Sequence, residues 1–379
     1  MFKYLKGDKF IWWIVIALTA ISLLVVYSST EFLAYKTRNG NTEFYLFKHL
    51  LISVFGFLLM FLCHQVRYSL YKKIGVLLLA LSIPLLLLTL MYGTELNQAR
   101  RWIEIPLFHL SFQPADLAKL AMVIYTAYIL SSNQNKIANP ISAFYKIIIP
   151  LIIVCGLIAP ADLSSAALLF ITCFMLMFIG RVRLKHLFGG LVVVMFLGIS
   201  CIGVASLAGY SGRITTWKSR IINYVDNEEE VWQTQQSKIA IASGGTFGNG
   251  PGHSEQSRYL PHPYSDFIFS IIIEEYGLLG GIIIVFLYMF LLLRTVRLFY
   301  KMPNAFGAIL AVGLCISLVV QAFMNMAVTV QLLPVTGLVL PFISMGGTSL
   351  VFTSISIGII LSVSRYIEDD EKPLKAFAK

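Results

Sequence analysis

Asp266 occupies a position where a carboxylate could act as a general base. A stretch rich in Gly, Pro and polar residues, 244–265, precedes it, and an unbroken apolar run follows within a few residues. A carboxylate at such a water–membrane boundary is solvated enough to ionise and shielded enough for its pKa to shift. The structural alternative is that Ser265 caps the following helix and Asp266 is a first-turn residue.

Further ionisable residues lie in or beside apolar segments, where charged groups are costly and are therefore candidates for function. Pro114 suits the first position of a helix, so Asp116 falls in the first turn and Lys119 three residues later on the same face, where the two can pair. Asp162 follows a break between two apolar runs. The structural alternatives are an Asp favoured at a helix start and a Lys whose amine reaches the interface.

Two adjacent carboxylates, Glu274 and Glu275, follow Asp266 on the same predicted helix. At a rise of 1.5 Å per residue they are expected about 12 Å deeper in the membrane. Two buried carboxylates are costly to ionise together, so one of them is expected to be protonated or paired.

Basic residues in the outer loops are candidates for binding phosphate groups. Arg213 and Arg220 open the longest loop, 210–265, and Arg100 and Arg101 precede another apolar segment. Together they could form a basic mouth. Charges that are simply solvated in loops are the alternative.

The run 325–350, near the end of the chain, is expected to form a second wall of a substrate site. Broken backbone at membrane depth must line a cavity or be covered by protein. The segment is therefore expected to face the one that contains Asp266. The residues that break its helical pattern are Pro334, Gly337, Pro341, Gly346 and Gly347.

The composition requires a membrane protein. Of 379 residues, 58% are hydrophobic and 13% charged, with a mean hydropathy of +0.79, whereas a soluble domain is about a quarter charged. We expect an all-α polytopic integral membrane protein. The net charge of +10 is scattered through loops and does not indicate nucleic-acid binding. The first apolar run is long enough to span and lacks a signal-peptide cleavage site.

About ten transmembrane helices are expected, with one large extracytoplasmic loop, 210–265, between the seventh and eighth. Most of the 29 Lys and Arg residues lie in inner segments if both termini are cytoplasmic. Within the loop, residues 233–242 could form an amphipathic helix lying on the membrane. The whole chain, 1–379, is expected to be one transmembrane domain. The apolar segments are 10–29, 46–64, 74–92, 114–132, 146–161, 163–180, 187–209, 266–292, 306–330 and 344–364.

The chain resembles the SEDS family, named for shape, elongation, division and sporulation. Four blocks carry the resemblance and run in family order over almost the whole chain. They are Gln113-Pro114-Ala115-Asp116-Leu117-Ala118-Lys119; Ala161-Asp162-Leu163-Ser164-Ser165; Gly244 through Tyr259-Leu260-Pro261 to Ser265-Asp266-Phe267-Ile268-Phe269; and Leu332 through Gly337 and Pro341 to Gly346-Gly347.

This resemblance implies a peptidoglycan glycosyltransferase that polymerises lipid II into glycan strands on the outer face of the bacterial inner membrane. It implies a class B penicillin-binding protein and other membrane proteins of the division complex as partners. Asp266 corresponds to the essential acid of the family's large loop, and Lys119 and Asp162 to its intramembrane Lys and Asp. The resemblance is consistent with a divalent cation, Mg²⁺ or Mn²⁺, whose ligands the sequence does not specify.

Some positions separate this chain from the usual family pattern. Residues 259–261 and 265–266 resemble the division member more than the elongation member. Ala161 stands before Asp162 where the family usually has Pro. His262 and Tyr264 stand where it usually has Glu and His, so a Tyr replaces the usual His near the acid.

The implied chemistry is an inverting glycosyl transfer. The donor's undecaprenyl pyrophosphate is already a good leaving group and the acceptor hydroxyl needs a base, so one ionised carboxylate, Asp266, suffices. A lipid II flippase, an elongation-type polymerase and a non-catalytic scaffold are the alternatives. The residues expected to bind substrate are Lys119, Asp116, Asp162, Arg213, Arg220, Ser265, Gly346 and Gly347.

Overall fold

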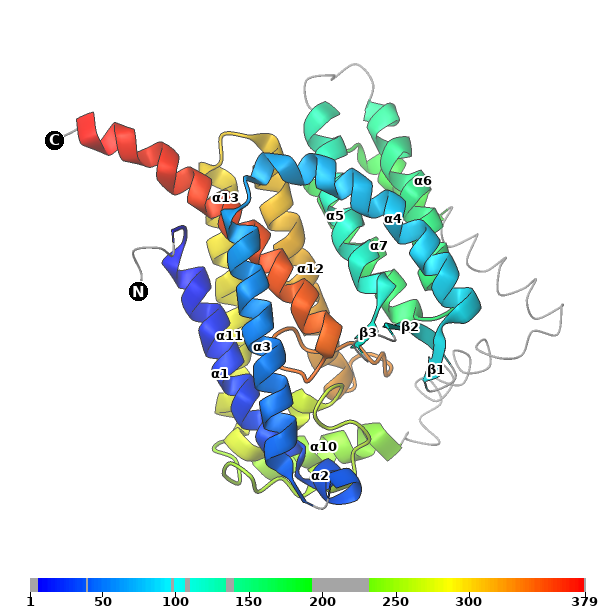
Figure 1. Cartoon of the computed structure of the whole chain (residues 1–379), viewed down its shortest axis with the longest axis vertical. Coiled ribbons are helices and arrows are strands. Elements are labelled where there is room, and N and C mark those ends of the chain that lie inside the picture. The colour runs from blue at the N-terminus through cyan, green and yellow to red at the C-terminus, as the bar shows by residue number, and fades with distance from the viewer. Residues whose placement is uncertain are drawn as a thin grey trace.

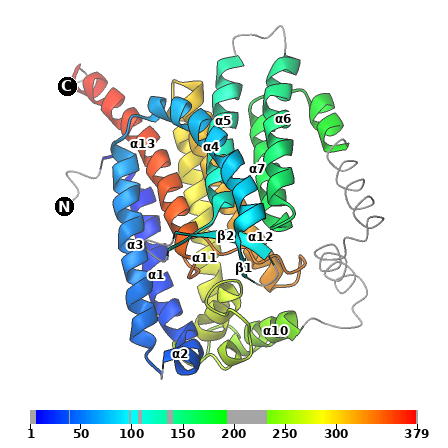
Figure 2. The same ribbon diagram turned by 45° about the vertical axis from the view of Figure 1, so that its right-hand side comes forward.

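Long helices make up most of the protein, as Figures 1 and 2 show. The computed structural model describes residues 6–38, 40–96, 99–105, 110–133, 140–192 and 232–377. The helices within these residues include α1 (Lys9–Ser29), α2 (Glu31–Arg38), α3 (Thr42–Gln65), η1 (Tyr68–Leu70), α4 (Tyr71–Tyr92), α5 (Pro114–Asn133), α6 (Pro140–Ile158), α7 (Leu163–Ile179), α10 (Trp232–Gly244), η2 (Gln256–Arg258), α11 (Ile268–Lys301), α12 (Ala305–Thr329) and α13 (Gly347–Phe377).

The helices follow the apolar segments of the sequence. Nine of the ten expected segments coincide with described helices, and the seventh, 187–209, lies mostly outside the described residues. Six of the described helices are long and apolar enough to cross a membrane. The most apolar window of α12 is 83% buried and that of α3 only 22%, so α12 is central. α3 exposes Phe47, Leu51 and Leu62, as a lipid-facing helix does.

A small antiparallel sheet joins α4 to α5, so the expectation of an all-α fold is wrong here. Trp102 lies opposite Thr94, and Ile103 lies opposite Phe112. Hydropathy detects spans and not short strands in a loop, whereas the aromatic and β-branched residues of the middle strand favour a sheet. This strand carries Arg101 to the candidate site. The strands, in sheet order, are β1 (Thr94–Leu96), β2 (Ala99–Ile105) and β3 (Leu110–Phe112).

The start of α1 and the later part of α13 lie together at one end of the bundle. Arg294 of α11 pairs with Asp8, which precedes α1. The amide of Asp8 donates to Ser364 Oγ of α13 at 2.7 Å. Figure 1 shows α2 and α10 at the opposite end of the molecule.

A helix lies at the place expected within the long loop, as α10. Its small polar side faces the protein, and Ser237 Oγ donates to the carbonyl of Thr329 at the end of α12 (2.8 Å). The exposed residues include Trp232 and Ile239, together with Gln235, Lys238 and Ser243. The exposed face is therefore mixed, and the amphipathic character that the sequence suggested is not found in α10.

α11 consists of two helical parts that meet at a sharp turn. Gly277 has φ +71° and ψ −174°, which is not helical. A Cβ built on Gly281 would be 3.1 Å from Ile273 Cγ1, although residues eight apart in one straight helix are separated by about 12 Å. The chain therefore folds back at Gly277. Residues 268–275 are all buried, whereas the part after the turn exposes large apolar side chains.

This turn overturns the expected depth of Glu274 and Glu275. Instead of lying further from the loop than Asp266, both lie against it. Glu274 accepts hydrogen bonds from Ser254 Oγ and from the next two loop amides (3.0 and 3.2 Å), and Glu275 accepts one from Ser28 Oγ in the last turn of α1. The prediction assumed one straight helix. Hydropathy cannot reveal a reversal, because a helix that is apolar on all sides is buried equally well by protein or by lipid.

Between α12 and α13 the chain runs from residue 330 to 346 without a regular helix. This is the broken backbone that the Pro and Gly residues of the sequence predicted. Side chains from surrounding helices satisfy its carbonyl groups, as burial inside a membrane protein requires. The donor and acceptor pairs are Asn325 to Leu338, Gln321 to Val339, Tyr288 to Pro341 and Ser22 to Ile343.

Candidate active site

A cavity of about 600 Å³ lies where four helices begin. The first residues of α5, α7, α11 and α13 form its wall, together with β2 and the broken segment 330–346. All predicted site residues that the structure describes line this one cavity. They are Asp116, Lys119, Asp162, Ser265, Asp266, Gly346 and Gly347.

Asp266 lies half-buried in the cavity wall and accepts a hydrogen bond from Ser265 Oγ (3.1 Å). None of the ion pairs in the described part of the chain includes Asp266. Burial raises the pKa of Asp266, and the nearby Ser265, His262 and Arg101 only partly offset this effect. A carboxylate with a raised pKa is a stronger base.

The structural alternative for Asp266 is wrong. Phe267 is the N-cap residue of α11 and makes no side-chain capping bond, so Ser265 does not cap the helix and Asp266 is not in its first turn. Asp266 instead belongs to the loop that closes the cavity. The carboxylate of Asp266 therefore does not cap α11.

Asp116 and Lys119 form an ion pair at the start of α5. Lys119 Nζ lies 2.7 Å from Asp116 Oδ1, and the two residues are only 9% and 5% exposed. The amine of Lys119 therefore points into the bundle and does not reach for the interface. The second carboxylate oxygen of Asp116, Oδ2, is buried without a hydrogen-bond partner.

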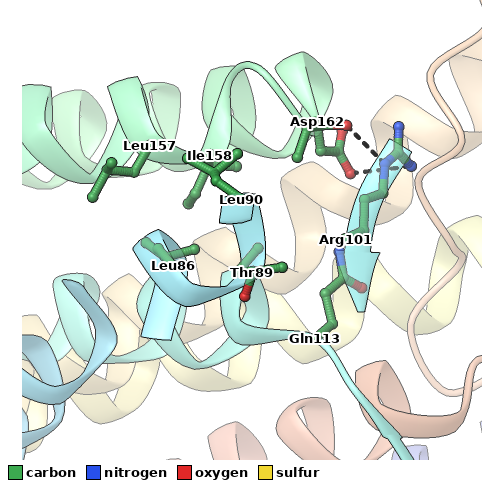
Figure 3. A pocket seen from close by; sticks show the side chains of 10 residues that line it. Leu86, Thr89, Leu90, Arg101, Gln113, Leu157, Ile158 and Asp162 are labelled. Carbon is green, nitrogen blue, oxygen red and sulfur yellow. Dashed lines mark hydrogen bonds and ion pairs between the residues drawn. The ribbon is translucent and has the colours of Figure 1, made fainter. Parts of the chain in front are cut away.

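Asp162 combines a structural contact with an electrostatic one. Its carboxylate caps α7 by accepting hydrogen bonds from the amide and the hydroxyl of Ser165 (3.1 and 3.0 Å). Arg101 reaches the same carboxylate from β2, with Nη1 3.5 Å from Oδ2, and its Nε donates to the carbonyl of Ala161 (2.8 Å). Figure 3 shows this pair at the edge of a small, mostly apolar pocket between α4 and α6. The pair lines both this pocket and the large cavity.

The four helix starts give the cavity a positive field, because the first amides of a helix are unpaired. At α5 and α7 that field already acts on Asp116 and Asp162. α13 has no acidic residue in its first turn, and Gly346 and Gly347 leave its amides uncovered by side chains. Helix starts of this kind bind phosphate groups. The start of α13 is therefore a suitable position in the cavity for an anionic group.

The charges of the cavity wall leave room for a cation. Its described side chains include three carboxyl groups (Asp116, Asp162 and Asp266) and two basic groups (Lys119 and Arg101). No group of three or more His, Cys, Asp or Glu in the described ranges could hold a metal by itself. Mg²⁺ typically uses one or two carboxylates plus ligand phosphates. The surplus carboxylate and the unpaired Asp116 oxygen fit that mode of binding.

His262 and Tyr264 lie beside the acid, at the positions that depart from the usual pattern. His262 Nδ1 is 3.1 Å from the Tyr264 hydroxyl, and both residues line the cavity. The carbonyl of His262 accepts hydrogen bonds from the amides of Ser265 and Asp266. These two residues thus shape the loop around the carboxylate.

The prediction and the structure differ on some residues. Arg213 and Arg220 lie outside the described residues. Arg101 belongs to the cavity through its pairing with Asp162, which its loop position alone did not indicate. Gln321 of α12 and Ser349 of α13 also line the cavity. A Gln within an apolar run is a signal that could have identified Gln321, because intramembrane polar groups usually face protein or water.

Fold and site together define a multi-pass membrane protein with a polar cavity that holds a half-buried carboxylate, two ion pairs and a phosphate-type helix start. The family model of the FtsW, RodA and SpoVE proteins, described as cell cycle proteins, matches residues 8–369. The chain belongs to this family.

Named relatives extend over nearly the whole chain. A probable peptidoglycan glycosyltransferase FtsW of Geobacter sp. (strain M18) is 33% identical over 362 residues, which cover 94% of this chain and 96% of the relative. Stage V sporulation protein E of Bacillus subtilis (strain 168) is 34% identical over 370 residues, which cover 93% and 95%.

Solved structures share the fold. The crystal structure of the rod shape determining protein RodA of Thermus thermophilus matches with a TM-score of 0.67 and 25% identity, covering 95% of this chain and 97% of that chain. A chain from a peptidoglycan synthase complex, described as coordinating polymerization and crosslinking, matches with a TM-score of 0.73 and 25% identity, covering 95% and 98%.

Proposed function

We propose that this protein is a peptidoglycan glycosyltransferase that polymerises lipid II for septal wall synthesis during cell division. The observation that carries the proposal is that Asp266 shares one cavity with Lys119, Arg101 and the uncovered start of α13. A base beside a site for an anionic leaving group is the arrangement that this reaction needs. The relatives named as peptidoglycan glycosyltransferase FtsW support the same reaction.

In the proposed step, Asp266 takes the proton of the acceptor sugar's 4-hydroxyl while that oxygen attacks the anomeric carbon of the donor. The bond between this carbon and the pyrophosphate oxygen breaks on the opposite face, and undecaprenyl pyrophosphate leaves with the electron pair. The configuration at the carbon therefore inverts. Ser265 orients the carboxylate through its hydroxyl, and the raised pKa strengthens the base.

The leaving group needs stabilisation of its charge more than it needs a proton. Lys119 and the amides at the start of α13, beside Gly346 and Gly347, are proposed to bind the pyrophosphate. Asp116 and Asp162 hold Lys119 and Arg101 in place. The same binding role is proposed for two residues outside the described part of the chain, Arg213 and Arg220.

A divalent cation, Mg²⁺ or Mn²⁺, is the proposed cofactor. Asp116 and the phosphate oxygens of the substrate would hold it, since the Oδ2 atom of Asp116 has no hydrogen-bond partner. When bound, such an ion neutralises charge that develops on the pyrophosphate. Lys119 already pairs with the other oxygen of Asp116. Lys119 and the cation would then bind the same phosphate group.

A lipid II flippase would use the same cavity and ion pairs and is the alternative function. A transport path must continue to the other side of the membrane. A pocket of about 30 Å³, lined by Ser317, Thr353 and Ser356 among others, extends the polar wall a short way. Further along α13, Ile359, Ile360 and Leu361 are buried, before Ser362 lines a separate pocket near the other end of the bundle. This apolar layer favours a site that works from one side of the membrane.

An elongation-type polymerase would perform the same reaction with a different partner. The relatives named FtsW and the sporulation relative are 30–34% identical, whereas the RodA of Thermus thermophilus is 25% identical. This difference favours the division role.

The proposed setting is the bacterial inner membrane, crossed by ten helices, with both termini in the cytoplasm. The chain would form one transmembrane domain, 1–379, whose loop 210–265 lies outside. A class B penicillin-binding protein and other division proteins are the proposed partners. Likeness to a chain of a complex that couples polymerization to crosslinking supports the first of them.

The test is polymerisation of purified lipid II in detergent, with the candidate partner and Mg²⁺ present. The wild type should make glycan polymer. Asp266→Asn should bind lipid II but polymerise about 10²–10⁴-fold more slowly, because it cannot accept the proton. A wild type that makes no polymer under any metal or partner condition, yet moves lipid II across liposomes, would establish the flippase instead.

A further inference from the structure

We propose that Asn325 is a positioning residue for Asp266, an inference that rests on the function proposed above. Asn325 lies on α12 behind the cavity wall and is 1% exposed. Its amide nitrogen donates to two carbonyls, that of Asp266 at 2.9 Å and that of Leu338 at 2.6 Å. An amide group has two N–H donors, so both are used.

These two carbonyls come from two segments that lie side by side in the cavity wall. Asp266 precedes α11, and Leu338 lies in the broken segment between α12 and α13. A Cβ built on the neighbouring Gly337 would lie 3.7 Å from Asp266 Oδ2, so the backbone of this segment runs beside the carboxylate. By joining the segments, Asn325 sets where the carboxylate stands relative to the backbone of the broken segment.

The broken segment holds the preceding peptide groups in the same way. Ser344 Oγ donates to the carbonyl of Ser265 (2.6 Å), and the amide of Met345 donates to the carbonyl of Tyr264 (2.9 Å). With Asn325, donors from α12 and the broken segment bond three consecutive carbonyls of the loop, those of residues 264–266.

The side chain of the base has little to fix it apart from Ser265, because no described ion pair includes it. Its orientation therefore depends on the peptide that carries it. Misplacement of a reacting group by about 1 Å can reduce a rate by about 10²-fold. Loss of the two hydrogen bonds that Asn325 donates is thus expected to lower the rate of the chemical step and to leave substrate affinity unchanged.

The test compares two substitutions that remove donors stepwise, measured as polymerisation of lipid II per folded protein. Asn325→Ser keeps a single donor. Asn325→Asp keeps the shape but turns an oxygen toward carbonyl oxygens. We expect kcat to fall by about 10²-fold for Asn325→Asp and by less for Asn325→Ser. KM should stay close to that of the wild type, and the inflection of the pH–rate profile should move.

Tyr288→Phe is the matched control. It removes another buried side-chain bond to the same broken segment, at the carbonyl of Pro341, away from the base. We expect a lower melting temperature with the wild-type kcat and pH profile. If Tyr288→Phe lowers kcat as much as the Asn325 variants do, the effect is general loosening and the inference is overturned.

Ser344→Ala keeps the inference testable if Asn325→Asp does not fold, and it should change kcat in the same direction. Wild-type kcat and pH profile in the folded Asn325→Ser and Ser344→Ala proteins would overturn the inference. The proposed function would survive that result if the wild type polymerises and Asp266→Asn does not. If the wild type has no polymerase activity, both the proposed function and the inference about Asn325 fail.

Discussion

At the residue scale, the ion pair of Asp116 and Lys119 allows stability and function to be separated. Lys119→Met leaves a buried carboxylate without its partner, which typically costs about 3–5 kcal/mol of unfolding free energy, so a lower melting temperature and loss of polymerisation are expected. Adding Asp116→Asn removes the uncompensated charge. The double variant should recover much of the melting temperature and stay inactive, because the pyrophosphate ligand is still missing. Recovery of activity together with stability would show that Lys119 is only structural.

Arg101 offers a second test at the residue scale, through the pH dependence of the rate. A protonated Asp266 cannot accept a proton, so polymerisation should fall as the pH is lowered through the raised pKa of this carboxylate, whose main cause is burial. Arg101 counteracts that shift, whereas Asp162 adds to it. Arg101→Gln removes the first influence and leaves Asp162 without its cation, so the inflection in kcat/KM should move to higher pH. An unchanged inflection would argue against Asp266 as the base.

Residues that act through local spacing could be predicted from the sequence, and residues that act through the fold could not. The spacing of Asp116 and Lys119 on one helix face indicated that they could pair, and the structure shows that pair. The bond from Arg101 to Asp162 depends on how the sheet packs against the start of α7. The role of Asn325 depends on which two loops meet behind it. A single polar residue in an apolar run indicates only that it faces protein.

At the element scale, the sequence predicted where helices occur better than where the chain goes between them. Apolar length, Pro114 and Asp162 were sufficient to predict the helices that begin beside them. The run 266–292 was predicted as one span, but its first part is a buried helix that turns back at Gly277. Hydropathy averaged over a window does not say in which direction the chain runs. The reversal at Gly277 and the small sheet could therefore be seen only in the structure.

The glycines of the loop before α11 provide the prediction at this scale. Gly248 and Gly252 have nearly the same positive φ, 82° and 79°. A Cβ on Gly248 would lie 2.2 Å from the carbonyl oxygen of Glu275, whereas one on Gly252 would meet nothing within 4 Å. Gly252→Ala should cost about 1–2 kcal/mol of unfolding free energy, from backbone strain alone.

Gly248→Ala carries the same strain plus a backbone clash that the neighbouring chain cannot relieve. We therefore expect little folded protein and no polymerisation from Gly248→Ala, with near-normal yield from Gly252→Ala. The measurements are the yield of monodisperse protein in detergent and its melting temperature. Equal behaviour of the two variants would mean that the close approach of the loop to Glu275 is not essential to the fold.

At the scale of the whole molecule, the cavity and the chain ends lie on opposite sides of the bundle. Gln233 of α10 contributes to the cavity wall, and α10 lies at the end remote from the start of α1 (Figure 1). The cavity therefore lies toward the end of the molecule that is remote from the start of α1. A polymerase that acts on the outer face needs this end of the molecule to be outside.

That orientation can be tested with Glu255 and Lys73. Glu255 lies in the loop beside Glu274, at the cavity end. Lys73 lies at the start of α4, at the other end, where Ser362 Oγ of α13 donates to the carbonyl of Val66. Both residues are exposed, so a cysteine at either position should react if a reagent can reach it.

In whole cells, with the five native cysteines replaced, an impermeant maleimide should label Glu255→Cys. It should label Lys73→Cys only after the membrane is permeabilised, because positively charged segments stay in the cytoplasm. Labelling of both after permeabilisation is the control for reactivity. The opposite pattern, with Lys73→Cys labelled in intact cells and Glu255→Cys protected, would put the cavity on the cytoplasmic side. Asp266 would then be unable to act on lipid II at the outer face, and the proposed function would fail at its first requirement.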